Sequence, residues 1–449
     1  MPDVRFFAPI GVSLGFWAGC ARDFECSVTL SDTVGTVAEV AWQTESAADS
    51  WVVFGVDGQT NLQSPIVQDE TTHHHTLFGV PSNRDLEYVA YVEQGDNVRT
   101  CAGAIRTDSL PSGIPRYDLS VNQTDESDAP WVAIANAGND RGQPVVVNRA
   151  GETVWWSSRQ EGIVVTQLEP MEGGVRFLEQ DLHREDPTAS AIVTMDWLGQ
   201  QEERIEISGA HHRFVSLDDG SMVALAVDVR DWTDPETGED LQVVGDRLIA
   251  VSPEGDQEEI FLTWDVLEVT TDGFGGFYGD ELDWTHGNSI WVDPTGETLL
   301  LTLGHLDSVL EIDRSTGALI RQIDAQSHVI TEGTTEFGFP HDARWTDDGT
   351  LLLMTTDVFS FGVEYDIDAE AGSISEIRRI GDDVEIYAAA LGEVQPMEHG
   401  GHLISYGMGG AIRELNQAGE VVWELWGKPG NDRLGSIRPF HSFAVSDDD

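Results

Sequence analysis

The sequence predicts an all-β fold, namely a six-bladed β-propeller preceded by a small β-sandwich. Three observations lead to this prediction. Glycine is frequent, and no long stretch repeats its apolar residues with helical periodicity. Short alternating apolar segments separated by turn residues fill positions 27–110. A pattern of strand, glycine turn and strand then recurs six times within 115–449.

The first 26 residues carry an apolar run, "FFAPIGVSLGFWAGC", which follows Arg5 and ends at Cys20. The tripeptide Ala-Gly-Cys at its end resembles the close of a bacterial lipoprotein signal, in which the cysteine is lipidated after cleavage. We therefore expect an exported protein, a periplasmic or cell-surface lipoprotein anchored through Cys20; a buried N-terminal strand is the alternative. Cys26 and Cys101 remain as an even pair that could form a disulfide in an oxidising compartment.

Residues 27–110 are expected to form the sandwich. The run "TLFGVPSNRDLEYVAYV" resembles the leucine–proline–tyrosine strand pair of fibronectin type III domains. His73, His74 and His75 are consecutive within this region, and side chains alternate faces along a strand. We therefore expect no shared metal site among these three histidines. A Pro-, Gly- and Ser-rich linker, "DSLPSGIPRYD", follows.

The repeat in 115–449 has an interval of roughly 50 residues, the length that four antiparallel strands and their turns require. One such sheet cannot bury both of its faces alone. Packing six sheets in a ring covers the faces and leaves only short edges. The turn glycines of the six copies are Gly151, Gly199, Gly255, Gly317, Gly372 and Gly419.

Three consecutive repeats begin with a histidine at one structural point. His212 and His341 each precede a turn glycine by eight residues, and His286 precedes one by ten. The first strand of each blade lines the central channel of a propeller, so we expect the three imidazoles to converge there. Histidine can act near neutral pH as nucleophile, proton donor or ligand. Three such imidazoles could alternatively hold zinc, although we predict neither a metal nor a cofactor.

The segments "THGNSIWVDPTGETLLLTLGHLDSVLEIDRSTG" and "FPHDARWTDDGTLLL" resemble the bacterial arylsulfate sulfotransferases. The closing "GGHLISYGMGGAIRELNQAGEVVWEL" is similar to the last blade of that family. The resemblance implies a six-bladed propeller that needs no nucleotide cofactor. It also implies transfer of a sulfuryl group from a phenolic sulfate ester to a phenol through a sulfohistidine intermediate.

The same resemblance assigns roles by motif. His341, in "PHDA", would be the nucleophile, and His286, in "HGNS", would hold sulfuryl oxygens or protonate the leaving phenol. His212 would assist as a third catalytic residue. The residues expected to contact substrate are Asn288, His211 and His305.

One departure from the family is clear. The family places an arginine in the strand after the His-x-Asn head, and Gly304 stands there in this sequence. Loss of a cation from a sulfate site weakens transition-state stabilisation. Arg213 and Arg344 lie near two heads, but strand parity is expected to turn them away from the channel.

The formal net charge of −56, from 80 acidic and 24 basic residues, disfavours nucleic acid and anionic membranes as partners. It favours a saline habitat or selection for solubility. The expected partners are a small phenolic sulfate donor and a phenolic acceptor, with membrane contact only through the lipid anchor. The rival hypothesis is a non-catalytic, surface-tethered propeller that binds a ligand.

Overall fold

A computed structural model describes residues 24–123, 129–138, 142–181, 190–270, 281–398, 400–428 and 433–440. The chain divides into two compact units, Met1–Pro111 and Ser112–Asp449, which we treat separately. The division falls within the segment "DSLPSGIPRYD". No helix in the described ranges is long and apolar enough to span a bilayer. Cys20 lies outside the described residues.

The N-terminal unit is built around one long strand, β2 (Ala38–Val56), whose side chains alternate between buried and partly exposed. This strand pairs antiparallel with four others, and a sixth strand extends the sheet beyond β5. All six strands thus belong to one hydrogen-bonded sheet, and its division into the two layers of a sandwich stays a prediction. Cys26 and Cys101 form a disulfide. The other strands are β1 (Ser27–Leu30), β3 (Leu62–Gln63), β4 (Val67–Leu77), β5 (Asp85–Gln94) and β6 (Asn97–Arg106).

The three consecutive histidines lie in β4 and alternate as predicted. His73 and His75 are buried on one face, whereas His74 is exposed on the other. Both buried rings stack on Trp42, with centroids 5.1 and 5.2 Å away, and both hydrogen-bond to the Ser50 hydroxyl. These two histidines are therefore core residues with their polar atoms satisfied.

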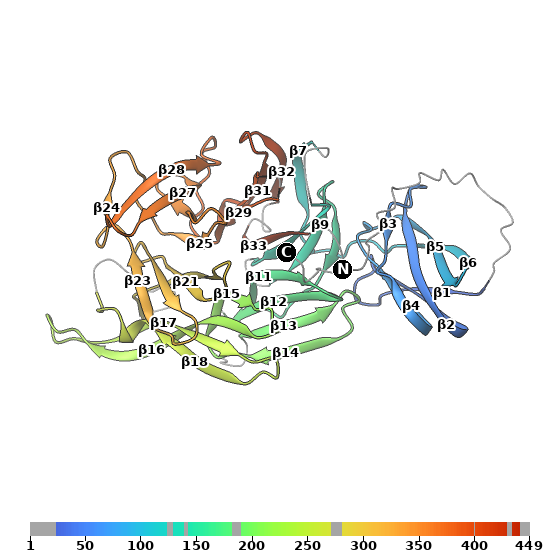
Figure 1. The fold of residues 1–449 in the computed structure, drawn as a ribbon, viewed down its shortest axis with the longest axis horizontal. Coiled ribbons are helices and arrows are strands. Elements are labelled where there is room, and N and C mark those ends of the chain that lie inside the picture. The colour runs from blue at the N-terminus through green and yellow to red at the C-terminus, as the bar shows by residue number, and fades with distance from the viewer. Residues whose placement is uncertain are drawn as a thin grey trace. The chain divides into compact units, whose positions relative to one another are not determined.

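The described residues of the C-terminal unit form six sheets, antiparallel apart from one short parallel strand in each of two sheets, which follow one another in the colour order from green to red (Figure 1). The first three sheets contain β8 (Trp131–Asn136), β9 (Val145–Asn148), β10 (Thr153–Trp156) and β33 (Leu434–Phe440); β11 (Ile163–Met171), β12 (Gly174–Asp181), β13 (Ala191–Asp196) and β14 (Glu202–Glu206); and β15 (Ala210–Ser216), β16 (Met222–Thr233), β17 (Asp240–Val251), β18 (Gln257–Leu262) and β19 (Leu282–Asp283).

The last three sheets contain β20 (Gly287–Val292), β21 (Thr298–Leu303), β22 (Ser308–Asp313) and β23 (Leu319–Ile323); β24 (Val329–Ile330), β25 (His341–Trp345), β26 (Leu351–Thr356), β27 (Ser360–Asp368) and β28 (Ser373–Ile380); and β29 (Gly392–Pro396), β30 (His402–Tyr406), β31 (Ala411–Leu415), β32 (Val421–Gly427) and β7 (Tyr117–Asn122). Two short 3₁₀ turns are η2 (Thr263–Asp265) and η3 (Gly407–Gly409).

Each predicted strand–glycine–strand repeat is the outer hairpin of one sheet. The pairs are β9–β10, β13–β14, β17–β18, β22–β23, β27–β28 and β31–β32. All six turn glycines have positive φ, between 62° at Gly372 and 90° at Gly255, a conformation that glycine adopts without steric cost. The hairpin predictions are therefore confirmed.

The sheets succeed one another in a closed cycle. Their innermost strands contact in the order β33, β11, β15, β20, β25 and β29, and β29 contacts β33 again. The first sheet takes its innermost strand, β33, from the end of the chain, and the last sheet takes its outermost strand, β7, from the beginning of the unit. Both chain ends of the unit are thus hydrogen-bonded into sheets formed by distant sequence.

The sheets bury both faces, as β21 illustrates. Leu299 and Leu301 pack in one cluster with Leu248 of the preceding sheet. Leu300, on the other face of the strand, packs in a second cluster with Leu351 of the following sheet. A continuous apolar run on a strand has this arrangement when neighbouring sheets cover both faces.

Candidate active site

The three histidine heads sit at irregular points of the innermost strands. In β15, β20 and β25 the pairing register shifts close to the histidine, which marks a β-bulge. A non-glycine residue with positive φ lies at each head, a conformation that is uncommon and concentrates at functional sites. These residues are His212 (54°), His286 (49°) and Asp342 (59°).

The structure brings the three predicted imidazoles together. His212 and His341 line a buried cavity of ≈ 20 Å³, and the ring of His286 lies 5.4 Å from that of His212. Phe339 lies between His286 and His341, with its centroid 5.4 and 5.3 Å from the two rings. A cavity of this size holds about one water molecule. The site is therefore assembled but closed around a small polar centre.

His341 is held as a neutral imidazole. Its Nδ1 lies 2.9 Å from the carbonyl oxygen of Phe339, which can only accept, so Nδ1 carries the proton. Nε2 therefore presents a lone pair, to which the Leu391 amide donates a long bond of 3.3 Å. Burial lowers the pKa of His341 to about 3. A neutral imidazole with an available lone pair is the form in which histidine acts as a nucleophile.

His212 belongs to a chain of buried polar groups that ends on Asp246. The Nδ1 atoms of His211 and His212 are 2.8 Å apart, and His211 Nε2 donates to Asp246 across 2.9 Å. The Asp246 carboxylate also accepts from the Thr285 hydroxyl and the Gly287 amide, each at 2.6 Å. Burial, followed by the charge of His211, lowers the pKa of His212. His211 thus orients His212 rather than lining the cavity.

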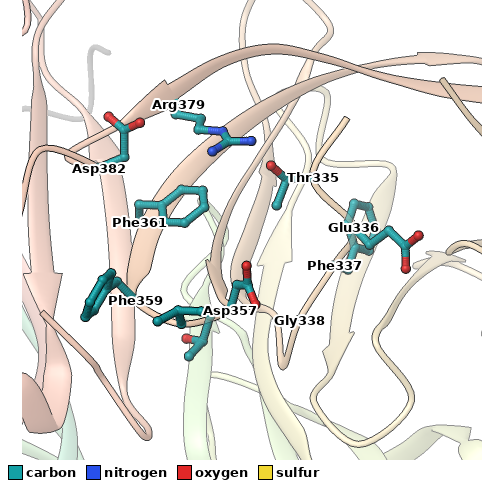
Figure 2. A pocket seen from close by; sticks show the side chains of 11 residues that line it. Thr335, Glu336, Phe337, Gly338, Asp357, Phe359, Phe361, Arg379 and Asp382 are labelled. Atoms are coloured by element: carbon teal, nitrogen blue, oxygen red, sulfur yellow. The ribbon is translucent and has the colours of Figure 1, made fainter. Parts of the chain in front are cut away.

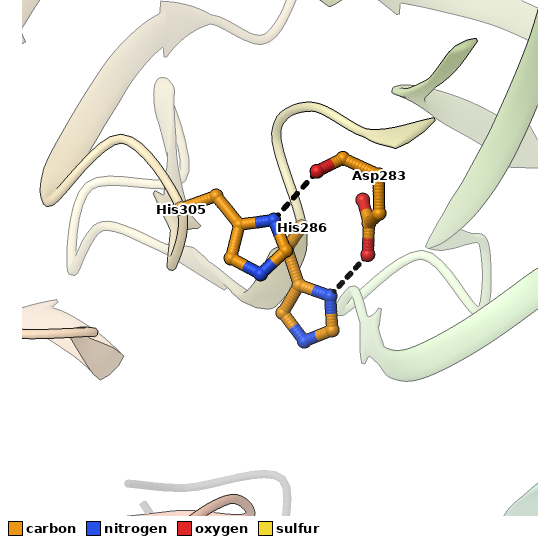
Figure 3. A group of neighbouring side chains, drawn as sticks. All are labelled: Asp283, His286 and His305. Carbon is orange, nitrogen blue, oxygen red and sulfur yellow. Dashed lines mark hydrogen bonds and ion pairs between the residues drawn. The ribbon is translucent and has the colours of Figure 1, made fainter. Parts of the chain in front are cut away.

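His286 and His305 form a second group around Asp283 (Figure 3). His286 Nδ1 donates to the Asp283 carboxylate at 2.6 Å, and His305 Nδ1 donates to the Asp283 carbonyl at 2.7 Å. In the described ranges, this is the group whose ligand atoms lie close enough to share a metal ion. The two rings, however, are stacked at 4.7 Å with 28° between their planes, so their in-plane lone pairs do not converge. The group is therefore two stacked imidazoles, each hydrogen-bonded to Asp283.

Asn288 supports the segment that carries His341 in the next sheet. Its amide nitrogen donates to the carbonyl of Pro340, directly before His341, at 2.9 Å. Its Oδ1 is buried and has no hydrogen-bond partner in the described part of the chain. Asn288 also lines the central cavity, so this oxygen could accept a hydrogen bond from a bound group.

Gly304 occupies a position with no room for a side chain. A Cβ built there would lie 2.5 Å from Asn288 Nδ2 and 3.0 Å from the ring of Phe339. Since real Cβ atoms do not approach so closely, the arginine expected from the family cannot stand here without displacing both neighbours. The packing around position 304 therefore requires glycine in place of the family arginine.

Arg213 corrects one expectation. Strand parity was expected to turn it away from the channel, but it lines the same cavity as His212. The bulge in β15 is the reason, because a register shift between Ala210 and Phe214 lets two consecutive side chains face the cavity. Arg344, whose side chain is more exposed, does not line the cavity. Strand parity predicts the wrong direction for the Arg213 side chain, because a bulge breaks the two-residue period on which parity depends.

A buried charge network surrounds Trp291. Arg213, Arg344 and Arg438 lie over its ring at 5.2, 4.1 and 4.8 Å, respectively. All three arginines form ion pairs with Glu393, which lies in β29 of the last sheet, a sheet without a histidine head. Burial opposes ionisation of Glu393, but the three guanidinium groups lower its pKa to about 2.

Two larger hollows lie near these groups. One of ≈ 410 Å³ reaches His305, the histidine stacked on His286. Another of ≈ 550 Å³ is lined by three phenylalanines and Arg379, and Gly338 connects it to the segment before His341 (Figure 2). The phenylalanines are Phe337, Phe359 and Phe361.

Residues 118–327 match the model of the arylsulfotransferase (ASST) family. The matched range contains the heads at His212 and His286 and stops before His341. It supports a sulfotransferase-like family for this chain. No curated protein matches the sequence.

Solved structures of low sequence identity were also found. A protein of unknown function from Bacteroides caccae has 17% identity and a TM-score of 0.45, covering 70% of this chain and 99% of that chain. The periplasmic gluconolactonase of Pseudomonas aeruginosa has 12% identity and a TM-score of 0.40, covering 69% and 98%. A putative 6-phosphogluconolactonase from Bacteroides fragilis has 11% identity and a TM-score of 0.38, covering 88% and 99%.

Proposed function

We propose that this protein is an arylsulfate sulfotransferase-like enzyme that moves a sulfuryl group from a phenolic sulfate ester to a phenol through a sulfohistidine on His341. The observation that carries the proposal is the state of His341, a neutral imidazole whose Nε2 lone pair lies beside His212 in a buried polar cavity. The family match over residues 118–327 supports the same chemistry. We propose that no metal or nucleotide cofactor takes part.

In the first half-reaction, Nε2 of His341 attacks the sulfur, and the bond from sulfur to the aryl oxygen breaks. The electron pair stays on the phenolate oxygen, which takes a proton from His286. Asp283 accepts a hydrogen bond from Nδ1–H of His286 and so orients the ring, whose Nε2–H would donate the proton. His212, oriented by His211, assists through hydrogen bonding to the transferring oxygens.

In the second half-reaction, the oxygen of an acceptor phenol attacks the sulfur of sulfohistidine. The phenolic proton passes to His286, and the bond from Nε2 to sulfur breaks, which restores neutral His341. Each half-reaction releases one product before the next substrate reacts, so the kinetics should be ping-pong.

The test is turnover of a chromogenic aryl sulfate with a phenol acceptor. The variant His341→Ala should lose phenol release and the acid-labile sulfo group on the protein. His402→Ala is the matched control, because His402 is also a buried histidine but lies outside the cavity. Retained turnover in His341→Ala would overturn the role assigned to His341.

One observation favours a second function, that of a non-catalytic propeller that binds a ligand. The cavity of ≈ 20 Å³ holds about one water molecule and must open before a sulfuryl group can enter. A non-catalytic propeller that binds a ligand at its surface needs no such opening. Absence of turnover with every aryl sulfate tested, in a protein that remains folded, would favour this alternative.

We also propose the finer architecture expected from the sequence. The closed cycle of innermost strands supports a six-bladed propeller, and β33 would be the strand that closes the ring. The N-terminal unit would be a fibronectin type III-like sandwich that spaces the propeller. A scattering profile and an experimental structure of each unit test both statements.

Export as a lipoprotein is proposed as well. The Cys26–Cys101 disulfide supports an oxidising compartment, where such bonds persist. Mass spectrometry of the protein from its native host should find a lipid on Cys20 and no residue before it. An unmodified Cys20 in the mature protein would exclude the anchor.

A further inference from the structure

Arg213 forms ion pairs through one of its terminal nitrogens, whereas the other has no partner in the described part of the chain. Its Nη2 forms ion pairs with Asp342 at 3.0 Å and with Glu393 at 3.1 Å. Its Nη1 is buried and has no hydrogen-bond partner in the part of the chain that the structure describes. Arg213 is only 6% exposed and lines the central cavity with His212 and His341. A buried N–H group without a partner is costly, so this guanidinium is prepared for an acceptor.

The surrounding network has an excess of positive charge. Three guanidinium groups, those of Arg213, Arg344 and Arg438, share the carboxylates of Asp342 and Glu393. Glu169 and Arg176 lie next to this network and add one negative and one positive charge, so the difference in charge is unchanged. Within this network the guanidinium groups therefore outnumber the carboxylates by one, and the buried carboxylates of Asp246 and Asp283 are engaged separately by His211 and His286. A buried charge is stable when it is paired, and an anion in the cavity would pair it.

The cation comes from a different strand than the family resemblance implies. Gly304 in β21 has Asn288 Nδ2 2.5 Å from the place of its missing Cβ. The bulge in β15 instead brings Arg213 in from the preceding sheet, at the level of His212.

We propose that the central cavity, once opened, is an oxyanion site in which Arg213 binds the non-bridging oxygens of a sulfuryl group or of inorganic sulfate. Asp342 and Glu393 are positioning residues, because they hold Nη2 of the guanidinium and leave Nη1 without a partner among the described residues. The assignment to sulfuryl transfer rests on the proposed function. Anion binding can be measured without turnover.

The experiment is calorimetric titration of the full chain with sodium sulfate in about 1 M KCl, which shortens the Debye length to about 3 Å and screens the acidic surface. The test variant is Arg213→Met with Glu393→Gln, which removes one charge of each sign and so avoids an unpaired buried carboxylate. The matched control is Arg344→Met with Glu393→Gln, which makes the same change of charge in the same network without altering the cavity lining. A third variant, Arg213→Lys, keeps the charge but loses the planar fork.

Wild-type protein should bind sulfate, and the Arg213 double variant should bind it at least tenfold more weakly than the Arg344 control, which carries the same Glu393→Gln substitution. Arg213→Lys should fall between them. Equal binding by both double variants, or no sulfate binding by the wild type, would overturn the inference.

His341→Ala separates this inference from the proposed function. It should bind sulfate but transfer none. Arg213-dependent binding without any aryl sulfate turnover would leave the anion site standing and remove the enzyme. Turnover that depends on His341 but not on Arg213 would do the reverse.

Discussion

At the scale of single residues, the site depends on which nitrogen carries each proton. The Phe339 carbonyl fixes the tautomer of His341, and Asp283 fixes that of His286. The two rings thus differ in their partners, a backbone carbonyl for His341 and a carboxylate for His286. A nucleophile and a proton donor in one site require such a difference between two histidines.

The pH profile follows from the pKa of His341, which burial lowers to about 3. The phenol burst of the first half-reaction should fall by less than about twofold between pH 7 and pH 5. A nucleophile with an ordinary histidine pKa of about 6.5 would lose about 25-fold over the same range. Rapid-quench measurement of the burst distinguishes the two, and a steep acid limb near pH 6.5 would contradict the assigned state.

The close approach of Gly304 to Asn288 predicts coupled substitutions. Gly304→Ala should lower the free energy of unfolding by about 1–3 kcal/mol, because its Cβ would press on Asn288 Nδ2. Asn288→Ala removes that atom, so the double variant should lose less than the sum of the single losses. Urea denaturation of the four proteins in a double-mutant cycle checks this. Additive losses would show that the two side chains do not compete for space.

The sequence predicted the histidines of this site but not the groups that support them. His212, His286 and His341 recur at one point of the repeat, which is a pattern that a sequence can carry. Asp283 precedes His286 by three residues, and this spacing could have marked it as a partner. Asp246 comes from the middle of β17, two strands away from the strand of His211 in the same sheet, so only the folded sheet reveals their contact.

At the scale of strands and sheets, two kinds of feature differ in how far sequence determines them. The outer hairpins were predictable, because glycine with positive φ and alternating apolar residues are local signals. The bulges in β15, β20 and β25 were not, since a register shift depends on the partner strand. For this reason, the predicted direction of the Arg213 side chain was wrong.

The packing of β21 between two sheets predicts a large stability loss on truncation. Leu301→Ala should lower the free energy of unfolding by about 2–5 kcal/mol, because Leu301 is fully buried in the cluster shared with the preceding sheet. Ile320→Ala, in the exposed part of β23, should change it by less than about 0.5 kcal/mol. Chemical denaturation followed by tryptophan fluorescence compares them. Similar losses would mean that the sheets are loosely packed.

At the scale of the whole C-terminal unit, buried neutral histidines make stability depend on pH. The pKa of His341 is below its unfolded value of about 6.5, so the unfolded chain binds a proton that the folded chain does not between about pH 6.5 and pH 3. Stability must therefore fall as pH decreases through this window. Glu393, whose pKa is about 2, acts in the same direction at lower pH, because only the unfolded carboxylate is protonated there.

This linkage predicts a measurable difference between variants. The wild type should lose about 2 kcal/mol more than His341→Gln between pH 7 and pH 5, since glutamine takes up no proton in either state. Denaturation in high salt at both pH values isolates this contribution from repulsion among surface carboxylates. Parallel pH dependences in the two proteins would mean that His341 can be protonated in the folded state.

The pairing of β33 with β8 has a consequence for biosynthesis. Trp131 of β8 pairs with Phe440 of β33, which is synthesised roughly 300 residues later, so β8 stays unpaired on that side until then. At translation rates of about 5–20 residues per second, that interval lasts roughly 15 to 60 s. During this time the nascent chain carries an uncovered β edge, to which another chain could add a strand. A holding chaperone that shields this edge should therefore raise the yield of folded protein more than one that acts only after release from the ribosome.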